Sequence, residues 1–89
     1  MPTITRFDGL TIHMYPKGAE HPPLHFHVTF NNKSCTLTID KCEILNGNIP
    51  ASKLKRVREW WEIYYPYLYW MLDECEIYKL PPLPRKKED

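Results

Sequence analysis

The fold of this chain is decided by residues 24–39, which read LHFHVTFNNKSCTLTI. Apolar and polar residues alternate along both halves of this stretch, and a period of two is typical of a β-strand with one buried face. Asn31 and Asn32 stand between the halves, and asparagine tolerates the left-handed backbone that a two-residue turn requires. The stretch therefore predicts an antiparallel β-hairpin.

The turn also predicts the register of this hairpin. If Phe30 pairs with Lys33, every apolar side chain of both strands falls on one face, because side chains alternate between the two faces of a sheet. The opposite face then carries two cross-strand polar pairs, which are His27 with Thr36 and His25 with Thr38. This polar face is left to solvent or to a partner.

The rest of the chain predicts more strands and then helices. Alternation over residues 10–14 predicts another strand, and residues 43–45 predict a short one. The C-terminal half carries apolar residues at helical spacing, and Pro66 interrupts them, so we expect two helices. Such elements form an α+β fold in which the helices cover one face of the sheet. The expected elements are a small antiparallel sheet of four to five strands over about residues 3–45 and helices over about 51–64 and 66–78.

Length and composition limit the class of protein. The 89 residues suffice for one domain, predicted over residues 1–79, and the proline-rich and charged residues 80–89 predict a disordered tail. A net charge of +1 gives no overall field toward nucleic acid, and no apolar run is long enough to span a membrane. The three cysteines are widely spaced and odd in number, which is typical of reduced thiols in a cytoplasmic protein.

Four histidines, His13, His21, His25 and His27, form the first candidate site. His25 and His27 are two residues apart on one strand and therefore point the same way, and His13 joins them if its strand is the neighbour. Neutral imidazoles bind divalent transition metals, and a three-ligand site with an open position can activate water. The alternative is structural, with these side chains hydrogen-bonded to the facing threonines.

A basic cluster forms the second candidate site. Lys53, Lys55, Arg56 and Arg58 crowd the start of the first predicted helix, where their charge opposes the helix dipole. Such a cluster can meet an anion, for example the phosphates of a nucleic acid or an acidic partner. The near-zero net charge disfavours nucleic acid, and the alternative is a solvated helix face.

An aromatic surface on the helices forms the third candidate site. The predicted apolar stripe consists of Leu54, Val57, Trp61, Tyr64, Leu68, Leu72 and Cys75. Five aromatic residues lie off this stripe, namely Trp60, Tyr65, Tyr67, Tyr69 and Trp70. Because monomers rarely expose large apolar patches, these residues predict an interface with a partner protein or a second copy of the chain. The alternative is that the helices bury a wider stripe.

The segment HPPLHFHV at residues 21–28 resembles the His-x-Pro-Pro-His-Phe-His-Val motif of a bacterial family of short proteins, the domain-of-unknown-function family four-one-six-zero. The opening MPTITRF, the residues His13-Met14-Tyr15 and the pair Glu59-Trp60 also resemble that family. Two features differ, because the prolines stand one position earlier and His13 stands where many members have arginine. The resemblance implies a compact cytosolic protein, often encoded beside another short family in pairs similar to toxin–antitoxin modules. It implies no reaction.

The sequence therefore leads to three functional hypotheses. The first is a small interaction or regulatory module that acts with a partner protein, as a component of toxin–antitoxin type. The second is a metal-dependent hydrolase or nuclease that uses the histidines, and the third is nucleic-acid binding through the basic cluster.

Overall fold

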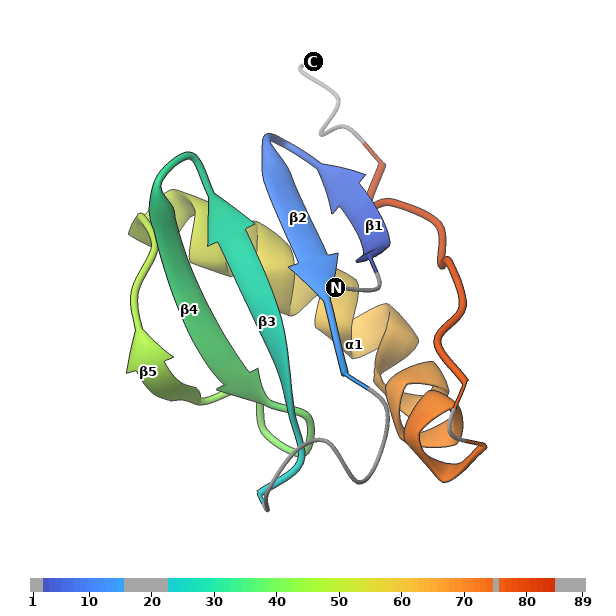
Figure 1. Ribbon diagram of the computed structural model, residues 1–89. Helices are drawn as coiled ribbons and strands as arrows, with labels where there is room; N and C mark the ends of the chain where they lie inside the picture. Colours follow the sequence, from blue (N-terminus) through green and yellow to red (C-terminus); the bar gives the residue numbers. More distant parts are fainter. Residues whose placement is uncertain (1–2, 16–22, 75, 85–89) are drawn as a thin grey trace.

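The computed structural model describes residues 3–15, 23–74 and 76–84. It consists of a five-stranded antiparallel sheet whose strands neighbour one another in chain order, with one long helix across one face (Figure 1). The elements are β1 (Thr3–Phe7), β2 (Leu10–His13), β3 (His25–Phe30), β4 (Lys33–Thr38), β5 (Ile44–Gly47) and α1 (Ala51–Asp73). The α+β class and the antiparallel sheet are confirmed.

The central hairpin has the register that the sequence predicts. Phe30 pairs with Lys33, and Val28 pairs with Cys35. Asn31 adopts a left-handed backbone with φ of 55°, which supplies the tight turn. The apolar side chains of β3 and β4 therefore face α1 together.

The core lies between the sheet and α1. Phe26, Val28 and Leu37 are fully buried on the sheet side, and Trp60 and Leu68 are fully buried on the helix side. Burying one large apolar side chain contributes roughly 1.5–3 kcal/mol, so this single layer supplies most of the driving force for folding.

The expected break into two helices is wrong, because α1 continues through Pro66 as far as Asp73. Proline in a helix interior removes one backbone hydrogen bond and costs about 3 kcal/mol. Leu68 and Met71 after Pro66 are both fully buried in the same core as Trp60 before it, and this burial outweighs the cost. In Figure 1 the orange half of the helix turns away from the direction of the yellow half, as expected where a proline bends a helix.

The segment after α1 runs along the domain beside β1 (Figure 1). The sequence predicted disorder for residues 80–89, yet residues 80–84 are packed and 85–89 lie outside the described residues. The Leu80 amide donates to the Ile4 carbonyl at 2.9 Å, the Trp60 indole donates to the Pro81 carbonyl at 2.9 Å, and Leu83 is only 8% exposed. Prolines pre-set an extended backbone, so ordering this segment costs little entropy and leaves its carbonyls available to donors.

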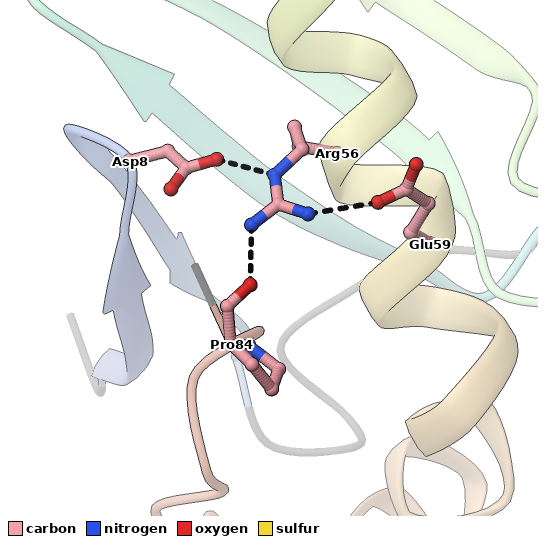
Figure 2. A network of polar contacts seen from close by, with 4 residues as sticks. All are labelled: Asp8, Arg56, Glu59 and Pro84. Carbon is pink, nitrogen blue, oxygen red and sulfur yellow. Dashed lines mark hydrogen bonds and ion pairs between the residues drawn. The ribbon is translucent and has the colours of Figure 1, made fainter. Parts of the chain in front are cut away.

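Arg56 connects three parts of the chain (Figure 2). Its Nε donates to Asp8 Oδ2 at 2.6 Å in the turn between β1 and β2, and its Nη1 donates to Glu59 Oε2 at 2.9 Å on α1. Its Nη2 donates to the Pro84 carbonyl at 2.6 Å. The planar guanidinium suits this role because its donors point in fixed, divergent directions.

We predict that Arg56→Lys lowers the free energy of unfolding by about 1–3 kcal/mol, because one ammonium group cannot satisfy three separated acceptors. Urea denaturation of the two proteins measures this difference. The matched control is Lys55→Arg at the exposed neighbouring position, which should change the free energy of unfolding by no more than about 0.5 kcal/mol. Equal stability of the two variants would contradict a structural role for the Arg56 contacts.

Candidate functional site

Three of the four predicted histidines lie together on the sheet face opposite α1. His13 in β2 pairs directly with His27 in β3, which meets the condition that the sequence left open. His27 pairs across β3 and β4 with Thr36, and His25 pairs with Thr38, as predicted. His21 lies outside the described residues.

The three imidazoles are in ring contact, with His27 at the centre. The His13 and His27 ring centroids lie 5.4 Å apart and their planes differ by 7°, so the two rings stack. The His25 ring lies 5.1 Å from His27 at 81°, and the Tyr15 ring lies 5.2 Å from it at 83°. His27 is therefore surrounded by aromatic rings on several sides.

Hydrogen bonds fix part of this arrangement. His25 Nδ1 donates to the Pro23 carbonyl at 2.7 Å, which places a proton on that nitrogen. His27 Nδ1 is hydrogen-bonded to Thr36 Oγ1 at 3.3 Å, so the pairing with threonine that the structural reading expected is present for His27.

These rings do not present a ready metal site. Within residues 3–15, 23–74 and 76–84, no group of three or more His, Cys, Asp or Glu side chains is placed to hold a metal ion. The ring planes give a physical reason, because an imidazole binds metal through an in-plane lone pair and the lone pairs of two stacked, parallel rings do not converge. A metal at these residues requires at least one ring to rotate.

His13 is buried, with 5% of its surface exposed. Burial lowers the pKa of His13 below its usual value, and the neighbouring His27 lowers this pKa further. The structure therefore holds His13 in its neutral form near neutral pH, which is compatible with stacking on a second imidazole.

Most of the predicted basic cluster is engaged within the domain. Arg56 makes the three contacts described above, and the Arg58 guanidinium donates twice to the Cys42 carbonyl at 3.3 Å. Lys53 Nζ lies 5.2 Å from the Phe30 ring centroid, at cation–π distance, and Lys55 is exposed. These contacts give the cluster a structural role that the sequence could not show.

The two described cysteines are poor nucleophiles. Cys35 and Cys42 are free and buried. Burial raises the pKa of both thiols, that of Cys42 to about 12, so the reactive thiolate is scarce at neutral pH. Cys75 lies outside the described residues.

The aromatic surface differs from the prediction at one residue. Trp60 was expected on the surface, but it is fully buried, because the helix directs residues 57, 60, 68 and 71 into the core. The other four predicted residues, Tyr65, Tyr67, Tyr69 and Trp70, are 37–51% exposed.

Two apolar residues that the sequence analysis missed extend the aromatic surface. Ile63 is 53% exposed on α1, and Leu24 is 38% exposed just before β3. Leu24 joins Tyr69, Trp70, Leu72 and Asp73 around a hollow of about 400 Å³. No local sequence signal predicts this hollow, because it joins residue 24, just before β3, to residue 69 on α1.

A smaller hollow of about 130 Å³ lies beside the first one. It is lined by Pro23, Leu24, Asp40 and Tyr69, so Leu24 and Tyr69 belong to both hollows. Desolvation, followed by the charges of Asp40 and Tyr65, raises the pKa of Tyr69, which therefore stays protonated at neutral pH.

The fold and these surfaces define a small α+β domain with a polar, histidine-bearing sheet face and an aromatic helix surface. Residues 9–71 match the family described as Domain of unknown function (DUF4160), and the chain belongs to this family. No curated protein and no solved structure matches the chain. Among the described residues, no helix is long and apolar enough to cross a membrane.

We predict that stability falls on acidification and that His13 causes part of this loss. The pKa of His13 is lower in the folded state than in the unfolded state, so below about pH 6.5 the unfolded chain binds the extra proton more readily. The His13→Gln variant should therefore lose less stability than the unmodified protein between about pH 7 and pH 5. Urea denaturation at several pH values measures the slope of the free energy of unfolding against pH.

The control for the acid-stability experiment is Thr29→Gln, which introduces the same side chain on the same sheet face at a residue that does not titrate. It should keep the slope of the unmodified protein. A His13→Gln slope equal to that of the control would contradict the assignment.

Proposed function

We propose that this chain is a protein-interaction module that binds a partner protein through the C-terminal half of α1. The observation that carries the proposal is the exposure of Tyr65, Tyr67, Tyr69 and Trp70 together with Ile63. Monomeric proteins rarely expose this many large apolar side chains on one short helical segment unless they serve an interaction.

These exposed side chains are not part of the buried core. The core already takes Leu68, Met71 and Leu72 from the same part of the helix. Tyrosine and tryptophan are also weaker helix formers than the alanine, glutamate or lysine that would suit a solvated face. Tyrosine and tryptophan are instead the residues that dominate binding energy at protein interfaces.

The charge of this surface favours a different protein over a second copy. Residues 59–78 contain five acidic residues, Glu59, Glu62, Asp73, Glu74 and Glu76, and no lysine or arginine. A symmetric dimer brings the same surface of both subunits together, so these carboxylates would face one another. A partner with complementary charge avoids this repulsion.

The family resemblance suggests where to look for the partner. Proteins of this kind are often encoded beside a second short protein, in pairs similar to toxin–antitoxin modules. We therefore propose a regulatory role in which the helix surface binds the protein encoded by the adjacent gene.

We predict that the chain co-purifies with its neighbouring gene product and that Tyr67→Ser combined with Trp70→Ser weakens the complex by at least about 30-fold, as expected for loss of an interface hot spot. Co-expression followed by size-exclusion chromatography and calorimetry measures the association.

The control for the co-purification experiment is Leu45→Ser in β5, which also removes an exposed apolar side chain but lies away from α1 on the edge of the sheet. This variant should bind as the unmodified chain does. A chain that remains monomeric beside its neighbour, or equal binding by all three proteins, would refute the proposal.

A divalent transition-metal site at the histidines is a second candidate, supported by the short distances between the rings of His13, His25 and His27 rather than by their present orientation. It would support the hydrolase or nuclease hypothesis, with His21 as a fourth ligand. After rotation of one ring, three neutral imidazoles would bind zinc, nickel or copper ions.

For this second candidate we predict about one metal equivalent per chain in protein purified without a histidine tag, and its loss in His27→Ala. Elemental analysis and thermal unfolding with each added ion provide the measurements. Thr29→Val serves as the control, because it lies on the same sheet face, pairs with Thr11 and Ser34 and keeps all histidines. Background metal content together with an unchanged unfolding temperature would remove this candidate.

A further inference from the structure

The hollow at the C-terminal end of α1 has walls suited to a positively charged side chain. It lies among Leu24, Tyr69, Trp70, Leu72 and Asp73. We infer that this hollow receives an arginine or lysine side chain of the partner protein. The inference rests on the proposed interaction function and names the chemistry of the partner.

The aromatic walls provide the first argument. Tyr69 and Trp70 are both more than one-third exposed, so their ring faces are accessible. The face of an aromatic ring carries partial negative charge and attracts ammonium and guanidinium groups.

The Trp70 ring is held in place by Tyr78. It stacks on Tyr78 with centroids 5.3 Å apart and planes that differ by 16°. Tyr78 is itself anchored, because its hydroxyl donates to Glu76 Oε2 at 2.9 Å. A ring that is already oriented loses little entropy when a ligand binds, which favours recognition.

Negative charge around the hollow provides the second argument. Asp73 lines the hollow, and Asp40 lines the smaller hollow on the side shared with Tyr69. The last turn of α1 carries no basic residue, so the partial negative charge of the helix end is not offset by its own side chains. A cation placed beside Tyr69 would therefore meet carboxylates from α1 and from the turn after β4.

Leu24 completes the chemistry of the hollow. Arginine and lysine have long apolar stems, and these stems pack well on a leucine while the charged end stays near a carboxylate. A planar guanidinium can also stack on an aromatic ring, which favours arginine over lysine. The competing occupant is a purely apolar side chain, whose binding would not depend on a positive charge.

The test uses an acetylated and amidated pentapeptide of alternating leucine and arginine as the probe. Titration into the full-length, isotope-labelled chain should shift the NMR signals of the Trp70 indole and of residues 24 and 69–73. Replacing arginine by citrulline, its neutral isostere, should weaken binding by about fivefold or more.

Two pairs of variants localise the effect. Asp73→Asn should weaken peptide binding by about threefold or more, whereas Glu74→Gln, an exposed neighbour outside the hollow, should not. Tyr69→Leu should weaken it likewise, whereas Tyr15→Leu, which lines neither hollow and contacts His27 on the sheet face opposite α1, should not.

Two results would overturn the inference. One is equal binding of the arginine and citrulline peptides, and the other is the absence of shifts in the hollow at about 10 mM peptide. Either result leaves the proposed function standing if the neighbouring protein still requires Tyr67 and Trp70 for binding. Loss of that requirement would instead refute the proposed function itself.

Discussion

The pairing of β3 with β4 is the constraint on which the rest of this domain depends. A shift by one residue would exchange the two faces of the strands and move Phe26 and Val28 into solvent. With the register fixed, one face of the sheet is apolar and requires a cover, which α1 provides. The same pairing collects the imidazoles on the other face, so the core and the histidine surface have one origin.

The long helix has aromatic residues on two faces, and these faces have different roles. Trp60 fills the core and donates to the Pro81 carbonyl, whereas Tyr69 and Trp70 lie at the surface. Pro66 stands between the two regions and is exposed. A bend at this residue keeps the second half of the helix in contact with the core, since a helix that curves around a core follows its surface better than a straight one.

Sequence predicted the features that depend on local periodicity. The hairpin register and the pairing of His27 with Thr36 follow from the alternation of side chains around a two-residue turn. Features that depend on distant contacts were not predictable. The helix continues through Pro66 because the residues on both sides are buried in the same core. The presence of a proline in the sequence does not show whether its neighbours are buried in this way.

The candidate sites also combine features that local spacing predicts with features that depend on distant contacts. The exposed tyrosines followed from helical spacing. The same spacing placed Trp61 in the core and Trp60 on the surface, whereas Trp60 is fully buried and Trp61 only partly buried. The internal partners of Arg56 belong to the β1–β2 turn and to residue 84, both far away in sequence. The sequence could therefore not show whether a basic residue at the start of the helix binds a ligand or stabilises the fold.

The packed segment at residues 80–84 makes the two ends of the described chain depend on each other. This segment supplies an acceptor for the Trp60 indole, a donor for β1 and the buried side chain of Leu83. Removal of residues 80–84 would leave the Trp60 indole and the Ile4 carbonyl without these partners and would uncover the core that Leu83 seals. The stability of β1 is therefore coupled to residues more than seventy positions away in the sequence.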